Sequence, residues 1–139
     1  MAVTTYSLDF TIRHSYASQS AITLPITLIS DLSIYVDLLA KMDTGSTFCI
    51  FERRYADLLK LNLTAGIPQK VSTAMGTFQS YGHDVALSVF DFEWQAIVYF
   101  AEPESFSLNV LGRVGFLDRV RLGILDYEEL LYLGLDEQP

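Results

Sequence analysis

The sequence is poor in basic residues. Lys and Arg together number nine against 17 Asp and Glu, which gives a formal net charge of -8. The longest basic run is the pair Arg53-Arg54. Nucleic-acid binding draws its affinity from clustered Lys and Arg that neutralise phosphates. The composition therefore argues against a nucleic-acid partner.

Cysteine and histidine are also scarce. Cys49 is the only cysteine, which excludes an internal disulfide, and its apolar neighbours Phe48 and Ile50 predict a small buried side chain. The two histidines, His14 and His83, are far apart and have no second ligand at metal-site spacing. We therefore expect neither a metal ion nor another cofactor.

Long hydrophobic runs are missing as well. No stretch of 18 apolar residues exists, which is about what a membrane-spanning helix requires. The first 20 residues lack the basic start and apolar run of a signal peptide. These absences predict no membrane partner and a cytoplasmic location.

Apolar residues are nevertheless plentiful. Half of the 139 residues are hydrophobic, 13% are aromatic and only 19% are charged. A chain of this length is expected to form one domain, residues 1–139, with a sizeable core. Some of the apolar surface is then available for a subunit interface.

Short β-prone segments separated by turns dominate the chain. Period-two alternation and β-branched runs predict strands at residues 4–12, 22–29, 34–42, 47–51, 69–73, 77–81, 85–89, 94–100, 108–112 and 120–127. Within 22–29, Pro25 lacks a backbone donor and so indicates an edge strand or a bulge. Helical spacing predicts a helix in 52–61 and a brief helical turn at 115–118, whereas 130–135 fits a strand or a short helix. This pattern predicts a mostly β, barrel-like domain with one or two short helices.

Two motifs carry the candidate chemistry. Asp43-Thr44-Gly45-Ser46 places a carboxylate on a tight loop between two apolar strands, and Val110-Leu111-Gly112-Arg113 follows near the other end. An Asp-Thr-Gly tripeptide alone arises by chance in on the order of a few per cent of chains this long. A turn aspartate that caps its own loop is the simpler interpretation. The second motif at this spacing favours a functional loop.

The two motifs and the order of the elements around them resemble the retropepsin family of aspartic proteases, in cellular or bacterial rather than viral form. The resemblance is strongest over residues 22–127. It implies a single-domain retropepsin-like acid protease barrel and the activity of an aspartic endopeptidase, a hydrolase.

Hydrolysis of an amide needs a base that takes a proton from water and an acid that protonates the substrate, and two adjacent carboxyls sharing one proton can do both. This sequence contains one Asp-Thr-Gly and no Asp-Ser-Gly, so one chain holds half of such a pair. The resemblance implies a homodimer in which a two-fold axis brings Asp43 of each chain together around a water molecule.

The resemblance also implies roles for the neighbouring residues. Thr44 would link the two loops across the axis, Gly45 would contact the substrate main chain, and Ser46 would hydrogen-bond the Asp43 carboxylate. A flap that closes over an extended peptide would have its tip at four residues: Ala74, Met75, Gly76 and Thr77. Val110-Leu111-Gly112 would pack beneath the Asp43 loop.

Two departures from the viral pattern keep a second hypothesis open. Thr47 stands where viral enzymes carry an aspartate that pairs with the arginine of the second motif, so Arg113 has no predicted partner. The flap region also has only one glycine, Gly76. The alternative is a non-catalytic module with the same fold that binds an extended peptide or a partner protein.

Overall fold

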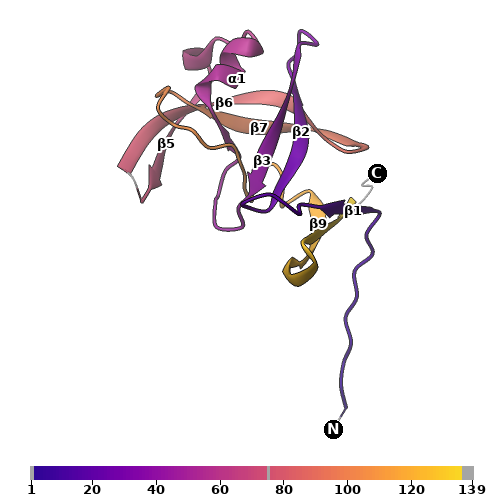
Figure 1. The fold of residues 1–139 in the computed structure, drawn as a ribbon. Helices are drawn as coiled ribbons and strands as arrows, with labels where there is room; N and C mark the ends of the chain where they lie inside the picture. The colour runs from indigo at the N-terminus through magenta and orange to yellow at the C-terminus, as the bar shows by residue number, and fades with distance from the viewer. Residues whose placement is uncertain (1, 75, 136–139) are drawn as a thin grey trace.

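The computed structural model describes residues 2–74 and 76–135 and is mostly β (Figure 1). Its strands are β1 (Ile12–Ser15), β2 (Thr23–Ile29), β3 (Tyr35–Met42), β4 (Ile50–Phe51), β5 (Ile67–Thr73), β6 (Gly76–Val89), β7 (Phe92–Ala101), β8 (Val110–Leu111), β9 (Val120–Leu125) and β10 (Leu130–Leu135). The described residues contain one α-helix, α1 (Arg53–Leu58), and two short 3-10 helices, η1 (Leu63–Ala65) and η2 (Asp126–Glu128). The predicted fold class is confirmed.

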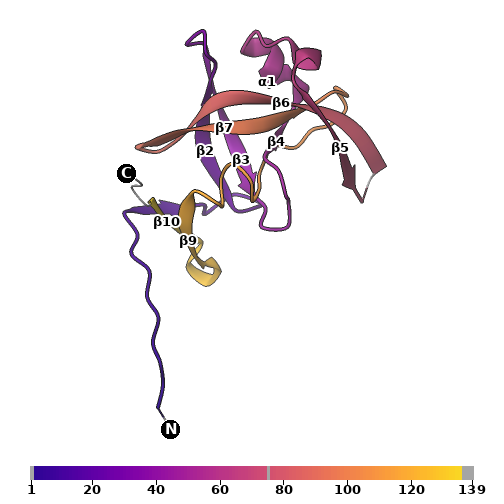
Figure 2. The ribbon, with the colours of Figure 1, turned by 180° about the vertical axis from the view of Figure 1, so that it is seen from behind.

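Six strands close into a barrel. The larger sheet has the order β2-β3-β8-β4-β7-β6-β5, and β2 pairs additionally with β6 through Thr27–Ile29. This extra pairing joins the two ends of the row β2-β3-β8-β4-β7-β6 into a ring. The first half of β6 instead pairs with β5, and this hairpin extends outside the ring (Figures 1 and 2).

Alternating side chains fill the barrel. In β2 the residues Leu24, Ile26 and Leu28 are buried, as the period-two pattern predicts. Helix α1 contributes buried Tyr55 and Ala56 to the same core and contacts β7. None of the helices described is long and apolar enough to cross a membrane.

Pro25 lies in a part of β2 where the absence of a backbone N–H breaks no hydrogen bond to a second strand. It pairs with Leu39 of β3, while the pairing of β2 with β6 begins only at Thr27. This half of β2 therefore has a single neighbouring strand in the described structure. The predicted edge position of Pro25 is confirmed.

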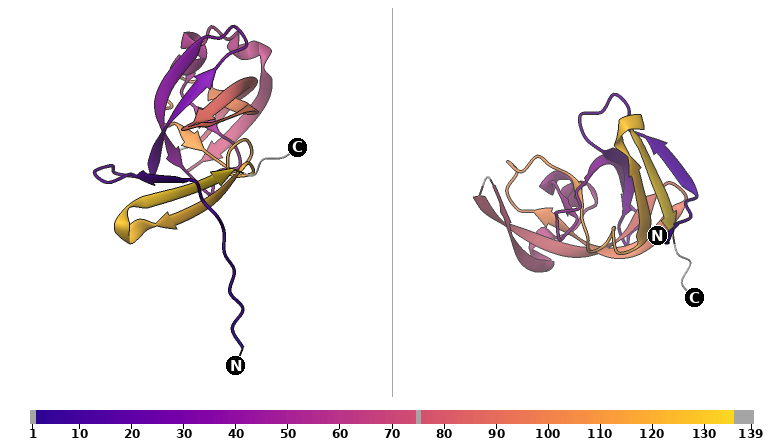
Figure 3. Two further views of the ribbon diagram at one scale, coloured as in Figure 1. Left: turned by 90° about the vertical axis from the view of Figure 1, so that its right-hand side faces the viewer. Right: turned by 90° about the horizontal axis from the view of Figure 1, so that it is seen from below.

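The chain ends form a separate three-stranded sheet below the barrel, in which β10 pairs antiparallel with both β1 and β9 (Figure 3). Residues 130–135 are thus a strand rather than a helix. The Tyr16 hydroxyl donates to Asp126 Oδ1 at 2.6 Å and ties the segment after β1 to η2. This hydrogen bond is the largest cause that raises the pKa of Tyr16 to about 12.

The predicted strand at 4–12 is wrong over most of its length. Strand β1 begins at Ile12, and the segment before it extends away from the body of the molecule (Figures 1 and 3). Tyr6 is 88% exposed, whereas Phe10 packs against Tyr132 with ring centroids 5.8 Å apart. Alternation shows that a segment can form a strand, but a strand also needs a neighbour with free donors and acceptors.

Two shorter elements also differ from the prediction. The segment 115–118 forms non-helical turns, in which the Leu117 N–H donates to the Gly112 carbonyl oxygen at 3.1 Å. The strand predicted at 47–51 is reduced to β4, because residues 46 and 47 bond to the segment that follows β8.

Cys49 lies in the core, as predicted, with no exposed surface. Its Sγ accepts a hydrogen bond from the Gly112 N–H at 3.4 Å and donates to the Val114 carbonyl oxygen at 3.5 Å. Burial raises the pKa of the thiol to about 12. The thiolate that reacts with electrophiles is therefore scarce at neutral pH.

Gly112 is the point of closest packing between β8 and the loop that follows β3. A Cβ there would collide with the Phe48 carbonyl oxygen and lie 2.7 Å from that of Ser46. Both obstacles are backbone atoms that are fixed by their own hydrogen bonds. Only glycine fits this position.

We expect Gly112→Ala to lower the free energy of unfolding by about 3 kcal/mol or more, because backbone must move to admit the methyl group. Urea denaturation followed by circular dichroism measures the change. The control is Gly123→Ala, whose Cβ would meet only the rotatable ring of Phe10, at 2.9 Å. Equal stability of the two variants would contradict this account of the packing.

We also expect Cys49 to resist N-ethylmaleimide at pH 8 in the folded chain and to react within minutes in concentrated urea, because burial both blocks the thiol and disfavours the thiolate. Intact-mass spectrometry counts the adducts. Rapid labelling without urea would show that the packing around Cys49 opens readily.

Candidate active site

The backbone that follows β8 holds the Asp43 loop from both sides. The Asp43 N–H donates to the Leu111 carbonyl oxygen at 3.0 Å. In the other direction, the Arg113 N–H donates to the Ser46 carbonyl oxygen at 2.9 Å, and the Val114 N–H donates to that of Thr47 at 2.8 Å. The two motifs, more than 60 residues apart in sequence, are thus hydrogen-bonded directly to each other.

Strand pairing explains why the loop has this shape. Strand β8 lies between β3, which it pairs in parallel, and β4, which it pairs antiparallel. The chain must therefore leave β3, pass around the end of β8 and return as β4. Asp43 occupies the point where this excursion begins.

The Asp43 carboxylate is half-buried and faces a cleft. Its Oδ1 accepts a hydrogen bond from the Gly45 N–H at 2.9 Å, the one such bond to this carboxylate within the described residues. A Cβ at Gly45 would lie 3.3 Å from the same oxygen. Gly45 therefore leaves room around the carboxylate and fixes its orientation.

Ser46 and Thr44 have different surroundings. The Ser46 hydroxyl donates to the Phe48 carbonyl oxygen at 2.7 Å. Because a hydroxyl carries one proton, it cannot at the same time donate to Asp43, as the resemblance implied. Thr44 is exposed at the turn of the loop.

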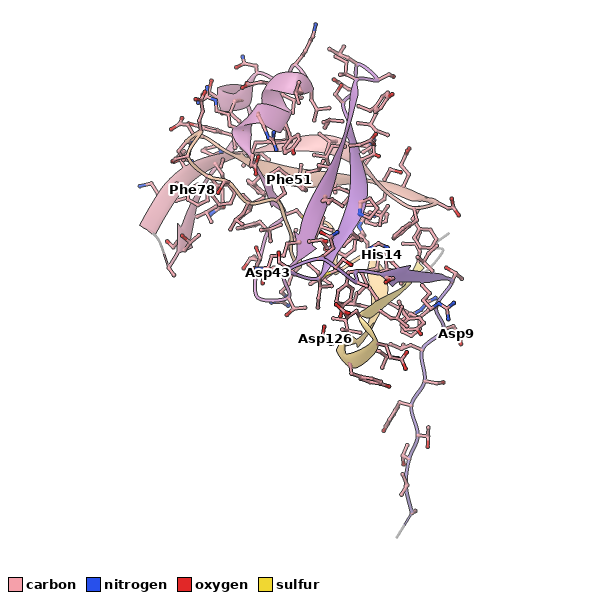
Figure 4. The ribbon with its side chains drawn as sticks, viewed as in Figure 1. Asp9, His14, Asp43, Phe51, Phe78 and Asp126 are labelled. Atoms are coloured by element: carbon pink, nitrogen blue, oxygen red, sulfur yellow. The ribbon has the colours of Figure 1, made fainter. Side chains whose placement is uncertain are left out.

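The cleft beside Asp43 has a volume of about 440 Å³. Its walls come from the Asp43 loop, from β5 and from the segment between β7 and β8. The lining residues are Asp43, Gly45, Ser46, Thr47, Phe48, Ile50, Lys70, Val71, Ser72, Thr73, Phe106, Leu108 and Val110. Figure 4 shows Asp43 at the lower end of β3, with Phe78 of the β5–β6 hairpin to one side.

The predicted flap region is the β5–β6 hairpin, which ends between Thr73 and Gly76. Gly76 has a φ of +129°, a conformation that favours glycine, and Thr77 exchanges a hydroxyl hydrogen bond with Ser72 at 3.1 Å. Ala74 lies at the turn, and Met75 lies outside the described residues. The described tip residues are not among those that line the cleft.

Strand β5 forms the cleft wall instead, through Lys70, Val71, Ser72 and Thr73. The sequence analysis missed these four residues, although they directly precede the hairpin turn. It also missed Phe106, which packs against Phe78 of the hairpin with ring centroids 4.7 Å apart. Contacts between segments that are far apart in sequence produce no periodic pattern, so these residues could not have been predicted from such a pattern.

Arg113, the last residue of the second motif, is exposed. Its backbone holds the Asp43 loop, but its side chain forms no hydrogen bond or ion pair with any residue that the structure describes. Thr47, which stands in place of the viral aspartate, lines a shallow pocket beside it. The link between the two motifs is therefore made by the backbone.

The cleft has one carboxylate among its lining residues. A single carboxylate can accept or donate a proton but cannot do both at one step, so acid–base hydrolysis would need a second group. In the part of the chain that is described, no three His, Cys, Asp or Glu side chains form a group that could hold a metal ion.

Comparison with known proteins gives a likeness in structure. No family model and no curated protein matches the sequence. A retropepsin-like aspartic protease from Rickettsia conorii superposes with a TM-score of 0.64 at 17% identity, over 88% of this chain and 98% of that one. EIAV protease complexed with the inhibitor HBY-793 superposes with a TM-score of 0.55 at 14% identity, over 72% of this chain and 88% of that one. This chain therefore has the fold of the retropepsin-like aspartic proteases.

Proposed function

We propose that the chain is an aspartic endopeptidase that acts as a homodimer, with Asp43 of each chain on either side of one water molecule. The observation that carries this proposal is the position of Asp43 in the cleft of a retropepsin-like fold. Asp43 is the one acidic residue that lines this cleft. A second chain is the simplest source of the second carboxyl.

The two carboxyls share one proton, because like charges so close together cannot both ionise readily. The ionised carboxylate takes a proton from the water, which attacks the peptide carbonyl carbon. The protonated carboxyl donates its proton to the carbonyl oxygen, which gives a tetrahedral diol. The carboxyl that took the water proton then donates it to the amide nitrogen as the C–N bond breaks, and one hydroxyl of the diol returns a proton to the other carboxylate.

The peptide lies along β5. This strand is the last in its sheet, so one edge of it has no neighbouring strand among the described residues. An extended peptide can pair with that edge through main-chain hydrogen bonds. In the dimer, Gly45 contacts the peptide main chain and the exposed Thr44 bonds to the loop of the partner chain.

The cleft selects apolar residues next to the bond that is cut. Its apolar lining comes from Phe48, Ile50, Val71, Phe106, Leu108 and Val110. These side chains remove apolar substrate surface from water. We further propose that the enzyme works in the cytoplasm, where its single cysteine stays reduced.

Asp43→Asn should reduce peptide cleavage by roughly a thousandfold or more, because an amide replaces the shared acid–base pair. A mixed peptide library, incubated at several pH values and read by mass spectrometry, measures both rate and specificity. Asp31→Asn, in an exposed turn, is the control for the loss of one charge. Undiminished cleavage by Asp43→Asn would refute the mechanism, and peptide retention without any cleavage would favour the binding module.

The homodimer makes a separate prediction. Adding excess Asp43→Asn chain to a fixed amount of wild type should lower the rate several-fold, because most wild-type chains then sit in mixed dimers that have one aspartate. The rate per wild-type chain should also fall on dilution, as dimers dissociate. A rate that neither the inactive chain nor dilution changes, together with a monomer in sedimentation, would contradict the shared site.

A further inference from the structure

The β5–β6 hairpin carries a single charge where it borders the cleft. Residues 67–81 include Lys70 and no Asp, Glu, Arg or His, although the whole chain has 17 acidic residues. The cleft-lining residues include one other charged side chain, that of Asp43. Lys70 is thus the only base among the residues that line the cleft.

The sheet around Lys70 supplies no counter-charge. Its partner across the ladder is Gln79 of β6, whose amide nitrogen donates to the Ser80 carbonyl oxygen at 3.0 Å. The Lys70 side chain is exposed and has no hydrogen bond or ion pair with any other described residue. Its ammonium is therefore available to a bound molecule.

Two arginines in a pocket that adjoins the cleft differ from Lys70 in this respect. Arg53 and Arg54 line a second pocket, which shares Phe106 with the cleft. The Arg53 guanidinium donates to the Glu102 carbonyl oxygen at 2.9 Å, and Arg54 pairs with Glu52 at 2.7 Å. Both arginines have partners within the chain, whereas Lys70 does not.

We infer that Lys70 binds an Asp or Glu side chain of the peptide substrate, so that the cleft prefers an acidic residue a few positions from the bond that is cut. The inference rests on the proposed function for the path of the peptide along β5. Lys70 and Asp43 line the same cleft from different elements, β5 and the loop after β3. A substrate carboxylate beside Lys70 meets an exposed ammonium, so added salt should weaken the attraction.

Binding to the Asp43→Asn chain tests the inference without turnover. The peptides are fluorescent, have an apolar pair at the centre and carry either Glu or Gln at one flanking position. Fluorescence anisotropy measures the affinity of each peptide, and the Glu or Gln is moved to each flanking position in turn. At one or two positions, Glu should bind about threefold more tightly than Gln, as expected of an exposed ion pair. Lys70→Met should abolish the difference, and Lys70→Glu should transfer the preference to a Lys peptide.

Lys60→Met provides the matched control, because Lys60 is an exposed lysine that does not line the cleft. It should keep the full preference for Glu. The inference is overturned if no position distinguishes Glu from Gln, or if Lys70→Met and Lys60→Met behave alike.

The same peptides, offered to the wild-type chain, separate this inference from the proposed function. Binding that prefers Glu, without any cleavage by wild type, would refute the peptidase and leave the role of Lys70 intact. Cleavage with equal rates for Glu and Gln peptides would support the peptidase and refute the role of Lys70.

Discussion

The backbone hydrogen bonds between residues 43–47 and 111–114 are the constraint on which the site depends. Three bonds of 2.8 to 3.0 Å fix both ends of the Asp43 loop to the segment after β8. They also explain why Gly112 is glycine, since its Cβ position is occupied by the backbone that these bonds hold in place. The carboxylate is therefore carried by a loop whose two ends are both hydrogen-bonded to residues 111–114.

The same constraint gives one chain only one of the two carboxyls that the proposed hydrolysis needs. A single loop of this kind presents a single carboxylate, and the other cleft walls add no second acid. The proposed dimer resolves this by symmetry. Within one chain, β1, β10 and β9 form a sheet of their own.

In the proposed enzyme, the cleft combines a preference that many peptides satisfy with one that few satisfy. The apolar lining residues, and the edge of β5 that has no neighbouring strand among the described residues, would accept extended peptides of many sequences. Selectivity among peptide sequences then depends on the few cleft-lining side chains that differ from these apolar ones. Lys70 is the clearest of them, since it is the single charge on the hairpin and has no partner among the described residues.

Much of the fold could be predicted from the sequence, because strands and turns leave local patterns. The alternation in β2 and β3, the helix at α1 and the edge position of Pro25 all follow from neighbouring residues. The Asp43 loop and its likeness to retropepsins could also be recognised from the sequence, because each of the two motifs is a short run of consecutive residues. The single Asp-Thr-Gly, on which the proposal of a second chain rests, is a property of the sequence alone.

The tertiary structure decided the features that depend on contacts between segments far apart in the sequence. It placed Lys70 and Phe106 in the cleft, turned the Ser46 hydroxyl toward Phe48, and left residues 2–8 outside the sheets. None of these outcomes has a periodic signature, because each depends on which segments meet after folding. Local pattern determines which elements can form, and the pairing of strands determines which side chains face the cleft.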